Sequence, residues 1–203
     1  MADEPREVLT IGHSSHKMEH FLALLREAGV TAVADVRSAP HSRHVPQFNH
    51  DTLKAALRDA GIAHVYLGKE LGGRPQSKAQ YRDGVADYEK IAASDAFQAG
   101  LQRVLDGAAT HRIALMCAEQ FPQDCHRCLL IGRALAARGV RVCHLLPDGS
   151  TATQANVESD LLRRTARDKD DLFLSESERV ALAYREYAHK VAFTAAAEQE
   201  RTA

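Results

Sequence analysis

Short apolar segments alternate with amphipathic ones along the first 150 residues of the chain. Apolar residues in the amphipathic segments recur every three or four positions, which is typical of helices that cover a sheet. The predicted strands span residues 8–11, 32–36, 64–67, 113–116 and 140–146. The predicted helices span residues 18–28, 49–61, 85–105 and 125–139.

Three of the predicted helices end in the same way. Gly29, Gly61 and Gly139 each follow the last helical residue and precede a β-branched residue and then a strand. A repeated helix-to-strand turn of this kind indicates βαβ units, whose strands run parallel. We therefore predict an α/β fold with three layers, in which a mostly parallel sheet of about five strands has helices on both faces.

The pattern changes after Ser150. Residues 151–171 are polar and mixed in charge, so we expect a linker or an irregular crossing. Ser175 and Glu178 fit a capping box, and apolar residues follow at helical spacing up to Val191. We predict an α/β domain over residues 1–150, with a linker and a C-terminal helix over residues 151–203. This helix would pack on the domain or on a partner, as in a homodimer formed through this helix.

Composition narrows the class of protein. The chain is 45% hydrophobic and 26% charged, as is usual for a soluble globular protein. Its 26 basic and 27 acidic residues nearly cancel, which argues against a general electrostatic affinity for nucleic acid or membranes but permits a local basic pocket. No segment approaches the roughly 20 apolar residues of a membrane span, and the first residues lack signal-peptide features. We expect a cytoplasmic protein without membrane contact.

Chemically active side chains follow the predicted strands. In a parallel α/β sheet, ligands bind beyond the carboxyl ends of the strands, so these side chains should share one site. The candidate catalytic residues are Glu119, Asp35, Cys125 and His126. The candidate substrate-binding residues are His13, Ser14, Arg37, Arg43 and Arg127.

The run from Cys117 to Arg127 is the strongest signal. Cys125 stands at a predicted helix start beside His126 and Arg127, where the helix dipole and positive neighbours favour a thiolate, although Asp124 opposes this effect. Glu119 is a candidate nucleophile or general acid/base. The arginines and the first helix N-terminus would bind an anion such as phosphate.

Structural roles compete with these assignments. Ser14 could simply cap a helix, Asp35 and Arg37 could form an ion pair that holds a loop, and Cys117 could be a packing residue. Four cysteines, three of them within residues 117–128, do not form a disulfide framework.

Two cysteine motifs indicate alternative functions. Cys125 and Cys128 formally make a Cys-x-x-Cys motif, but it opens the fourth helix of the series and not the first. Zinc could be bound by Cys117, Cys125 and His126 with His13 or His144, although this spacing matches no standard zinc motif. Neither a Walker phosphate loop nor a dinucleotide-binding glycine fingerprint is present in the sequence.

Several motifs occur together in an order that resembles the DUF488 family (domain of unknown function 488). They are Thr10-Ile11-Gly12-His13-Ser14, Asp35-Val36-Arg37-Ser38-Ala39-Pro40 with Ser42-Arg43, Gly61-Ile62, Leu71-Gly72-Gly73, Cys117-Ala118-Glu119 with Pro122, the CHR motif Cys125-His126-Arg127, and Val142-Cys143-His144 followed by Asp148-Gly149. The resemblance covers about residues 8–150. It implies a compact α/β domain and no particular reaction. Cys128 lies outside this signature, which weakens the thiol-exchange alternative.

We expect an enzyme, a hydrolase or group transferase, that acts on a phosphate-bearing substrate such as a nucleotide or a nucleic-acid end. One alternative is a module that binds or senses a nucleotide-like ligand without transforming it. The other is a thiol-redox or metal-binding protein that uses Cys117, Cys125 and His126. The sequence leaves the identity of any cofactor or metal, the strand order and the oligomeric state open.

Overall fold

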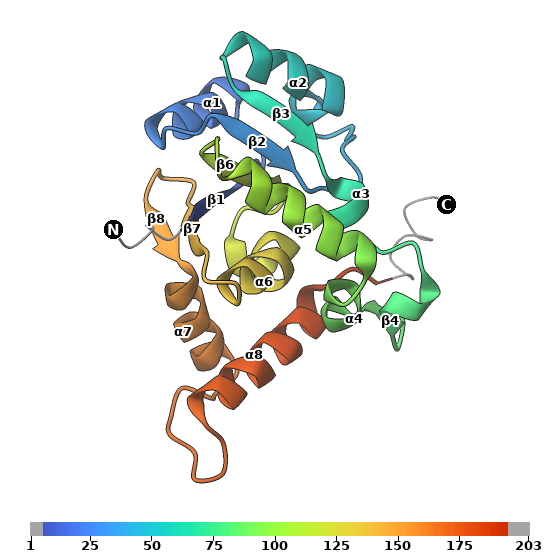
Figure 1. Ribbon diagram of the computed structural model, residues 1–203, viewed down its shortest axis with the longest axis vertical. Helices are drawn as coiled ribbons and strands as arrows, with labels where there is room; N and C mark the ends of the chain where they lie inside the picture. Colours follow the sequence, from blue (N-terminus) through green and yellow to red (C-terminus); the bar gives the residue numbers. More distant parts are fainter. Residues whose placement is uncertain (1–5, 195–203) are drawn as a thin grey trace.

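A six-stranded sheet runs through the centre of the molecule (Figure 1); the structure is a computed structural model that describes residues 6–194. The strand order is β3-β2-β6-β1-β7-β8. Five strands are mutually parallel: β1 (Glu7–Gly12), β2 (Ala32–Asp35), β3 (Ala63–Tyr66), β6 (Ile113–Cys117) and β7 (Arg141–Leu145). These are the five predicted strands, and the predicted α/β fold is confirmed. A sixth strand, β8 (Thr151–Thr153), runs antiparallel to β7 at the edge.

Helices cover both faces of the sheet because its strands are apolar on both sides. On one face, α1 (Met18–Glu27) and α2 (His50–Asp59) pack on a core that includes Val33 and Met116. On the other, α5 (Asp95–Gly107) and α6 (Arg133–Ala136) pack on a core that includes Ala34 and Leu115. Successive residues of one strand therefore enter different cores, and this alternation decides which side chains can meet at the end of the sheet.

The single helix predicted over residues 85–105 is wrong. The chain instead forms a hairpin of β4 (Tyr81–Arg82) and β5 (Val85–Ala86), then α4 (Tyr88–Ala92), and then α5. The hairpin turns at Asp83 and Gly84, both with positive φ, which is the Asp-Gly signal of a tight turn. The break before α5 has a physical cause, because the Ser94 side chain caps α5 by accepting a hydrogen bond from the Phe97 N–H.

Residues 151–164 are not a linker, contrary to prediction. They form β8 and α7 (Gln154–Arg164), and Thr153 caps α7 in a capping box with Asn156. Gln154, the first residue of α7, is buried. The usual capping-box pattern has Glu or Gln at the position that Asn156 occupies, so the sequence signal was weak.

The predicted C-terminal helix is confirmed as α8 (Glu176–Val191), which begins with the Ser175–Glu178 capping box. It packs on α7 and on the helix after β6 through a cluster that includes Leu129, Leu161 and Tyr184. The chain then joins the hairpin, because the Ala86 N–H donates to the Phe193 carbonyl at 2.9 Å. The segment after α8 thus lies beside α4 and close to the carboxyl edge of the sheet.

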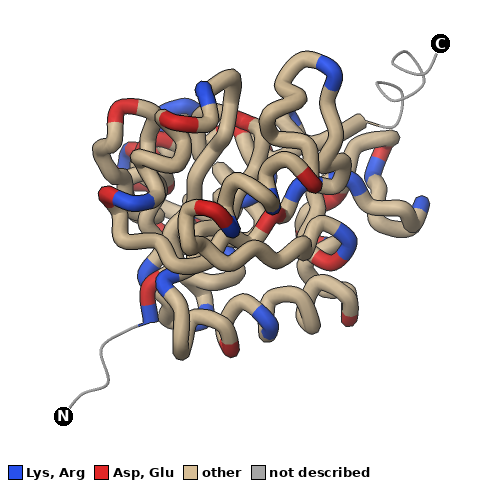
Figure 2. The backbone as a smooth tube through the Cα atoms, turned by 90° about the horizontal axis from the view of Figure 1, so that it is seen from above, with Lys and Arg blue, Asp and Glu red and all other residues tan. Residues whose placement is uncertain are grey.

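Shorter helical segments complete the chain. They are α3 (Gly68–Leu71), three 3₁₀ turns (Pro46–Phe48, Lys78–Gln80 and Pro122–Asp124) and a π-helical segment (Arg127–Gly132) that leads into α6. Among residues 6–194, no helix has the length and apolar character to cross a membrane. Lys and Arg are interspersed with Asp and Glu along the described chain (Figure 2), in keeping with a net charge of −1.

Candidate active site

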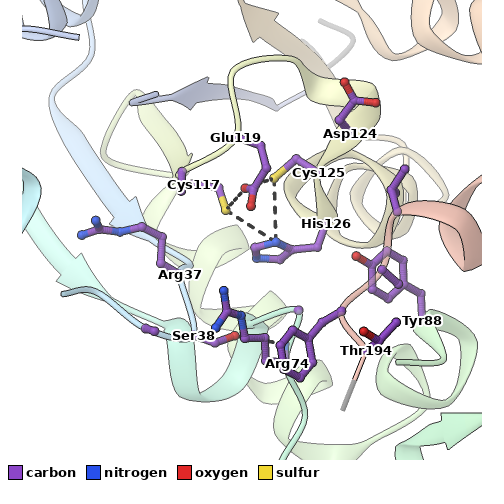
Figure 3. A pocket seen from close by; sticks show the side chains of 16 residues that line it. Arg37, Ser38, Arg74, Tyr88, Cys117, Glu119, Asp124, Cys125, His126 and Thr194 are labelled. Carbon is purple, nitrogen blue, oxygen red and sulfur yellow. Dashed lines mark hydrogen bonds between the residues drawn. The ribbon is translucent and has the colours of Figure 1, made fainter. Parts of the chain in front are cut away.

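A pocket of about 290 Å³ opens at the carboxyl edge of the parallel sheet. Its walls come from five parts of the chain: the loop after β2, Gly73-Arg74 after residues Gly68–Leu71, the start of α4, the loop after β6, and the end of α8 with the segment that follows it. Figure 3 shows side chains from these segments facing a common space. The pocket therefore lies at the carboxyl edge of the sheet, where ligands of parallel α/β sheets bind.

Four reactive side chains converge on one side of this pocket (Figure 3). Cys117 Sγ lies 2.7 Å from Glu119 Oε2, and Cys125 Sγ lies 3.1 Å from the same oxygen. His126 Nδ1 lies 3.5 Å from Cys117 Sγ and 3.8 Å from Cys125 Sγ. All four donor atoms lie within 4.8 Å of one another. We call these residues the thiol cluster.

The fold brings the cluster together in a short loop. Cys117 is the last residue of β6, and the 3₁₀ turn Pro122–Asp124 reverses the chain so that Cys125 returns beside it. Cys125 has an extended backbone just before the helix, and its sulfur accepts the backbone N–H of Arg127 at 3.4 Å. This is the position of an N-cap, where exposed N–H groups favour a negative charge.

The other ring nitrogen of His126, Nε2, also has a hydrogen-bond partner. His126 Nε2 lies 2.9 Å from the carbonyl oxygen of Val36 in the loop after β2. Because a carbonyl only accepts, Nε2 carries the proton and donates it. Nδ1 is therefore the nitrogen that faces both sulfur atoms.

A buried arginine braces the cluster from behind. Arg127 is fully buried, and its guanidinium donates to the carbonyl oxygens of Glu119 (2.6 Å) and Gln120 (3.1 Å). Within residues 6–194 no carboxylate pairs with it. Its positive charge thus acts directly on the loop and on the nearby sulfur of Cys125.

These surroundings shift the pKa values of the two thiols in opposite directions. Burial raises the pKa of Cys117 well above its usual value. Burial also opposes ionisation of Cys125, but the hydrogen bond from Cys117 and the charge of Arg127 outweigh it and lower the pKa of Cys125 to about 6. The surroundings thus favour ionisation of Cys125 over that of Cys117. A thiolate is the reactive form of cysteine as a nucleophile and as a metal ligand.

The pKa values of Glu119 and His126 also shift in opposite directions. Burial favours a neutral Glu119, yet the charge of His126 and the hydrogen bond from the Cys117 thiol lower the pKa of Glu119 to about 2. Burial disfavours a charged His126, but the negative charge of Cys125 raises the pKa of His126 above its usual value. The cluster therefore contains a carboxylate, a thiolate and an imidazole that readily binds a proton.

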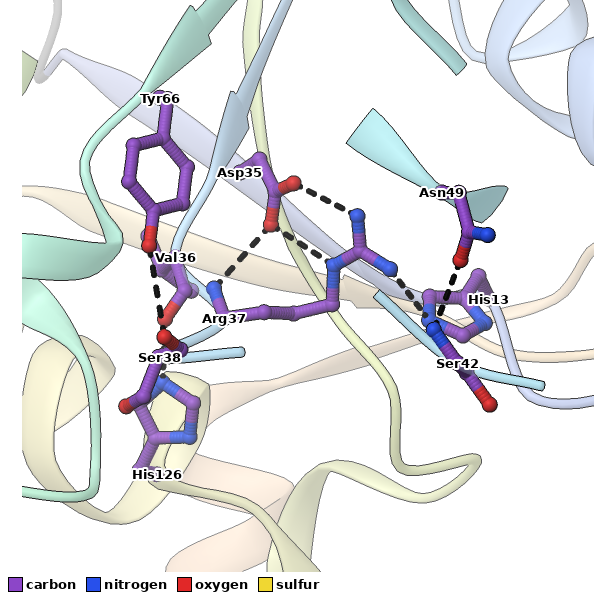
Figure 4. A network of polar contacts seen from close by, with 9 residues as sticks. All are labelled: His13, Asp35, Val36, Arg37, Ser38, Ser42, Asn49, Tyr66 and His126. Carbon is purple, nitrogen blue, oxygen red and sulfur yellow. Dashed lines mark hydrogen bonds and ion pairs between the residues drawn. The ribbon is translucent and has the colours of Figure 1, made fainter. Parts of the chain in front are cut away.

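Asp35, Arg37 and His13 form a second network next to the cluster (Figure 4). Both oxygens of the fully buried Asp35 accept from Arg37, at 2.9 Å from Nε and 2.7 Å from Nη2. Arg37 Nη1 lies 3.1 Å from His13 Nε2, and the His13 ring stacks on Phe48. Burial lowers the pKa of His13 to about 4, so this ring is neutral and accepts from the guanidinium.

The two networks lie on different faces of the sheet. Asp35 is paired with Met116, the residue before Cys117, so Asp35 and Cys117 point in opposite directions. The backbone between Asp35 and Arg37 links the networks, because the Val36 carbonyl binds His126. The structure thus gathers Cys125, His126 and Glu119 in the pocket and places Asp35 behind it.

The predicted binding residues are distributed unevenly. Arg37 is a pocket residue, whereas His13 belongs to the second network and Arg127 lies beneath the loop. Ser14 has a positive φ of 45° and its carbonyl binds His13, while Arg43 is exposed on the loop after β2. Neither Ser14 nor Arg43 is among the residues that line the pocket.

Other pocket residues were missed from the sequence. Arg74, Tyr88 and Thr194 all line the pocket, and the Arg74 guanidinium lies 4.8 Å above the Phe193 ring. The Gly72-Gly73 pair before Arg74 was a usable signal, since glycines permit close approach to a site. Thr194 gave none, because it follows a helix at the far end of the chain and not a strand of the sheet.

Cys128 and His144, considered above for redox or metal roles, belong elsewhere. Cys128 Sγ contacts Gln154, and His144 lies between Gln154 and Thr10 at 3.0 and 2.8 Å. The partner of Cys125 is therefore Cys117, and the fourth member of the cluster is Glu119.

Gly12 allows the cluster loop to pass over β1, and its replacement is our first prediction. A Cβ at this position would lie 1.9 Å from the Glu119 carbonyl oxygen, which is backbone and has no freedom to rotate away. We expect Gly12→Ala to lower the free energy of unfolding by about 3 kcal/mol or more, measured by urea denaturation. Gly61→Ala is the control: it has a positive φ but nothing within 4 Å, so it should cost only about 1 kcal/mol. Equal losses in the two variants would contradict this account.

Comparison with known proteins gives one match. The model of the family described as "Domain of unknown function DUF488" matches residues 17–134, which is more than half of the chain. The matched range contains α1, the second network from Asp35 onward and the whole thiol cluster. No curated protein and no solved structure matches significantly. The chain belongs to the DUF488 family.

Proposed function

We propose that the protein is an enzyme, a hydrolase or group transferase, that acts on a phosphate-bearing substrate such as a nucleotide or a nucleic-acid end. The thiol cluster is its catalytic centre. The observation that carries the proposal is the convergence of two sulfurs, a carboxylate oxygen and an imidazole nitrogen within 4.8 Å at the side of a pocket. Such groups are expensive to bury together and contribute little to packing.

The groups have distinct chemical capacities. A thiolate at Cys125 and a carboxylate at Glu119 are nucleophiles or ligands, and His126 transfers protons. Glu119 reaches solvent through the pocket, whereas Cys117, Cys125 and His126 are at most 8% exposed. A substrate that enters the pocket therefore meets Glu119 first.

The cationic side of the pocket supports an anionic substrate. Arg37 and Arg74 both line it, and Arg74 is positioned by its contact with the Phe193 ring. Guanidinium groups bind phosphate through paired hydrogen bonds. A phosphate held on this side would direct its ester bond toward the thiol cluster.

Activity assays with nucleotides and 5′- or 3′-phosphorylated oligonucleotides test the proposal. We expect Glu119→Gln and Cys125→Ser each to lower kcat/KM by about 100-fold or more, because each removes a group that acts on the reacting atoms. Cys143→Ser is the matched control, since Cys143 is a half-buried thiol beside Glu7, far from the pocket. Full activity in the folded Glu119 and Cys125 variants would refute the catalytic assignment. Saturable binding without turnover would show a ligand-binding module.

A further inference from the structure

We propose that the thiol cluster binds one zinc ion through Cys117, Cys125, His126 and Glu119. The site is the one that the proposed function makes catalytic, so the role of the metal in turnover rests on that proposal, whereas metal binding itself does not. The inference starts from the positions of the four donor atoms.

The spacing of the donors approximates a tetrahedral zinc centre. Zinc bonds of about 2.3 Å to sulfur and about 2.0–2.1 Å to nitrogen place a sulfur and a nitrogen about 3.5 Å apart. His126 Nδ1 lies 3.5 and 3.8 Å from the two sulfurs. Glu119 Oε2 is closer to the sulfurs, at 2.7 and 3.1 Å, and Glu119 is the one exposed residue of the four.

His126 is oriented as metal-binding histidines are. Such a residue usually donates its other ring N–H to a carbonyl or carboxylate, which fixes the ring and leaves the ligating nitrogen free. His126 Nε2 donates to the Val36 carbonyl at 2.9 Å, so Nδ1 faces the sulfurs. The backbone that supplies this carbonyl is in turn anchored by the Asp35–Arg37 ion pair.

The chemistry of the donors selects the metal. Two thiolates and an imidazole suit zinc, whereas magnesium and calcium prefer oxygen ligands. With both thiols ionised, the donor set has three negative charges, which a divalent cation and the buried Arg127 guanidinium balance. This balance gives a reason for a buried arginine that pairs with no carboxylate within residues 6–194.

The ligand set matches a reactive site more closely than a structural one. Cys117, Cys125 and His126 are buried and make three permanent ligands, while Glu119 occupies the position that opens to the pocket. Catalytic zinc sites keep three protein ligands and an exchangeable fourth position. A zinc ion there would act as a Lewis acid on a phosphoryl oxygen and offset the negative charge of the cluster.

A second group of possible ligands shows why the cluster is preferred. Asp35, His50 and His64 also place ligand atoms within 4.8 Å of one another. Both Asp35 oxygens, however, are bound by Arg37, whose positive charge would repel a cation. In the thiol cluster the Arg127 guanidinium donates to backbone carbonyls, and within residues 6–194 no guanidinium hydrogen-bonds to the four donor atoms.

Metal analysis of the full-length protein tests the proposal. Protein purified without a chelator or a metal-affinity column should contain about one zinc per chain by plasma mass spectrometry. Cobalt(II) added to chelator-treated protein should give the near-ultraviolet thiolate-to-cobalt absorption of a tetrahedral site. Cys125→Ser should lose this absorption and weaken zinc binding by more than the roughly 10- to 100-fold effect of an outer-shell change. Glu119→Gln, which leaves the buried ligands intact, should weaken zinc binding and retain the absorption.

Two other cysteines serve as controls. Cys128 is fully buried three residues after Cys125 but contacts Gln154, and Cys143 is half-buried beside Glu7. Cys128→Ala and Cys143→Ser should therefore keep full zinc content. Zinc loss in these variants equal to that of Cys125→Ser would overturn the proposal, as would a Cys117–Cys125 disulfide in metal-free protein that accepts no zinc or cobalt after reduction.

The outcomes separate this inference from the proposed function. Turnover by chelator-treated, zinc-free protein would overturn the role of the metal in turnover and leave the enzyme assignment standing. Stoichiometric zinc bound by Cys125, together with no turnover of any phosphate ester, would establish the metal site and refute the enzyme assignment.

Discussion

Asp35→Asn should lower the free energy of unfolding by about 3–5 kcal/mol, because it breaks a fully buried ion pair by removing one charge. The guanidinium of Arg37, only 5% exposed, would keep its positive charge but lose the negative charge opposite it, and an amide NH2 would replace one of its two acceptor oxygens. The neutral ring of His13 is its only other side-chain partner among the described residues, and it offers a single acceptor. Urea denaturation followed by circular dichroism measures the loss.

A double variant and an exposed pair make this prediction specific. Asp35→Asn combined with Arg37→Met removes the stranded charge, so it should be more stable than Asp35→Asn alone. Arg58 and Asp59 form an ion pair whose side chains are 77% and 70% exposed. Asp59→Asn should change stability by less than about 1 kcal/mol. A loss in Asp35→Asn no larger than in this control would contradict the importance of burial.

Arg127→Met should lower the free energy of unfolding by about 3 kcal/mol or more. The substitution removes two charge-assisted hydrogen bonds and leaves the carbonyls of Glu119 and Gln120 without their donor. Because these carbonyls belong to the loop that holds the thiol cluster, we also expect zinc affinity to fall by about 10- to 100-fold. Denaturation and competition with a zinc chelator measure the two effects.

The control for Arg127 is another arginine with a weaker role. Arg103 is 51% exposed and pairs with Glu70 at 2.7 Å. Arg103→Met should cost less than about 1 kcal/mol and leave zinc affinity unchanged. If Arg127→Met destabilised the protein but bound zinc as tightly as the wild type, Arg127 would stabilise the fold without bracing the site.

The parallel sheet was predictable because its strands are apolar on both faces and its helices end in glycine. The strongest local signals also held, including the Ser175–Glu178 capping box. The errors came where two patterns competed. The apolar spacing after Val85 favoured a helix, and it concealed the Asp83-Gly84 turn and the Ser94 cap that divide this region. Residues 151–164 are polar because only one side of α7 is buried.

The sequence predicted the location of the site better than the relative positions of its side chains. Strand ends in a parallel sheet meet at one edge, which is why Glu119, Cys125 and His126 were found together. The separation of Asp35 from the cluster depends on the register that pairs it with Met116, and one sequence contains no information on register between distant strands. Thr194 reaches the pocket through tertiary pairing with Val85, which no local pattern indicates.

The pairing of residues after α8 with the β5 hairpin has a consequence for biosynthesis. A ribosome releases the strands of the sheet and all four members of the thiol cluster before it releases the residues around Phe193 that complete the pocket. Nascent chains can therefore assemble the sheet while that side is still missing. During this interval the pocket beside the two sulfurs lacks the wall formed by residues 191–194.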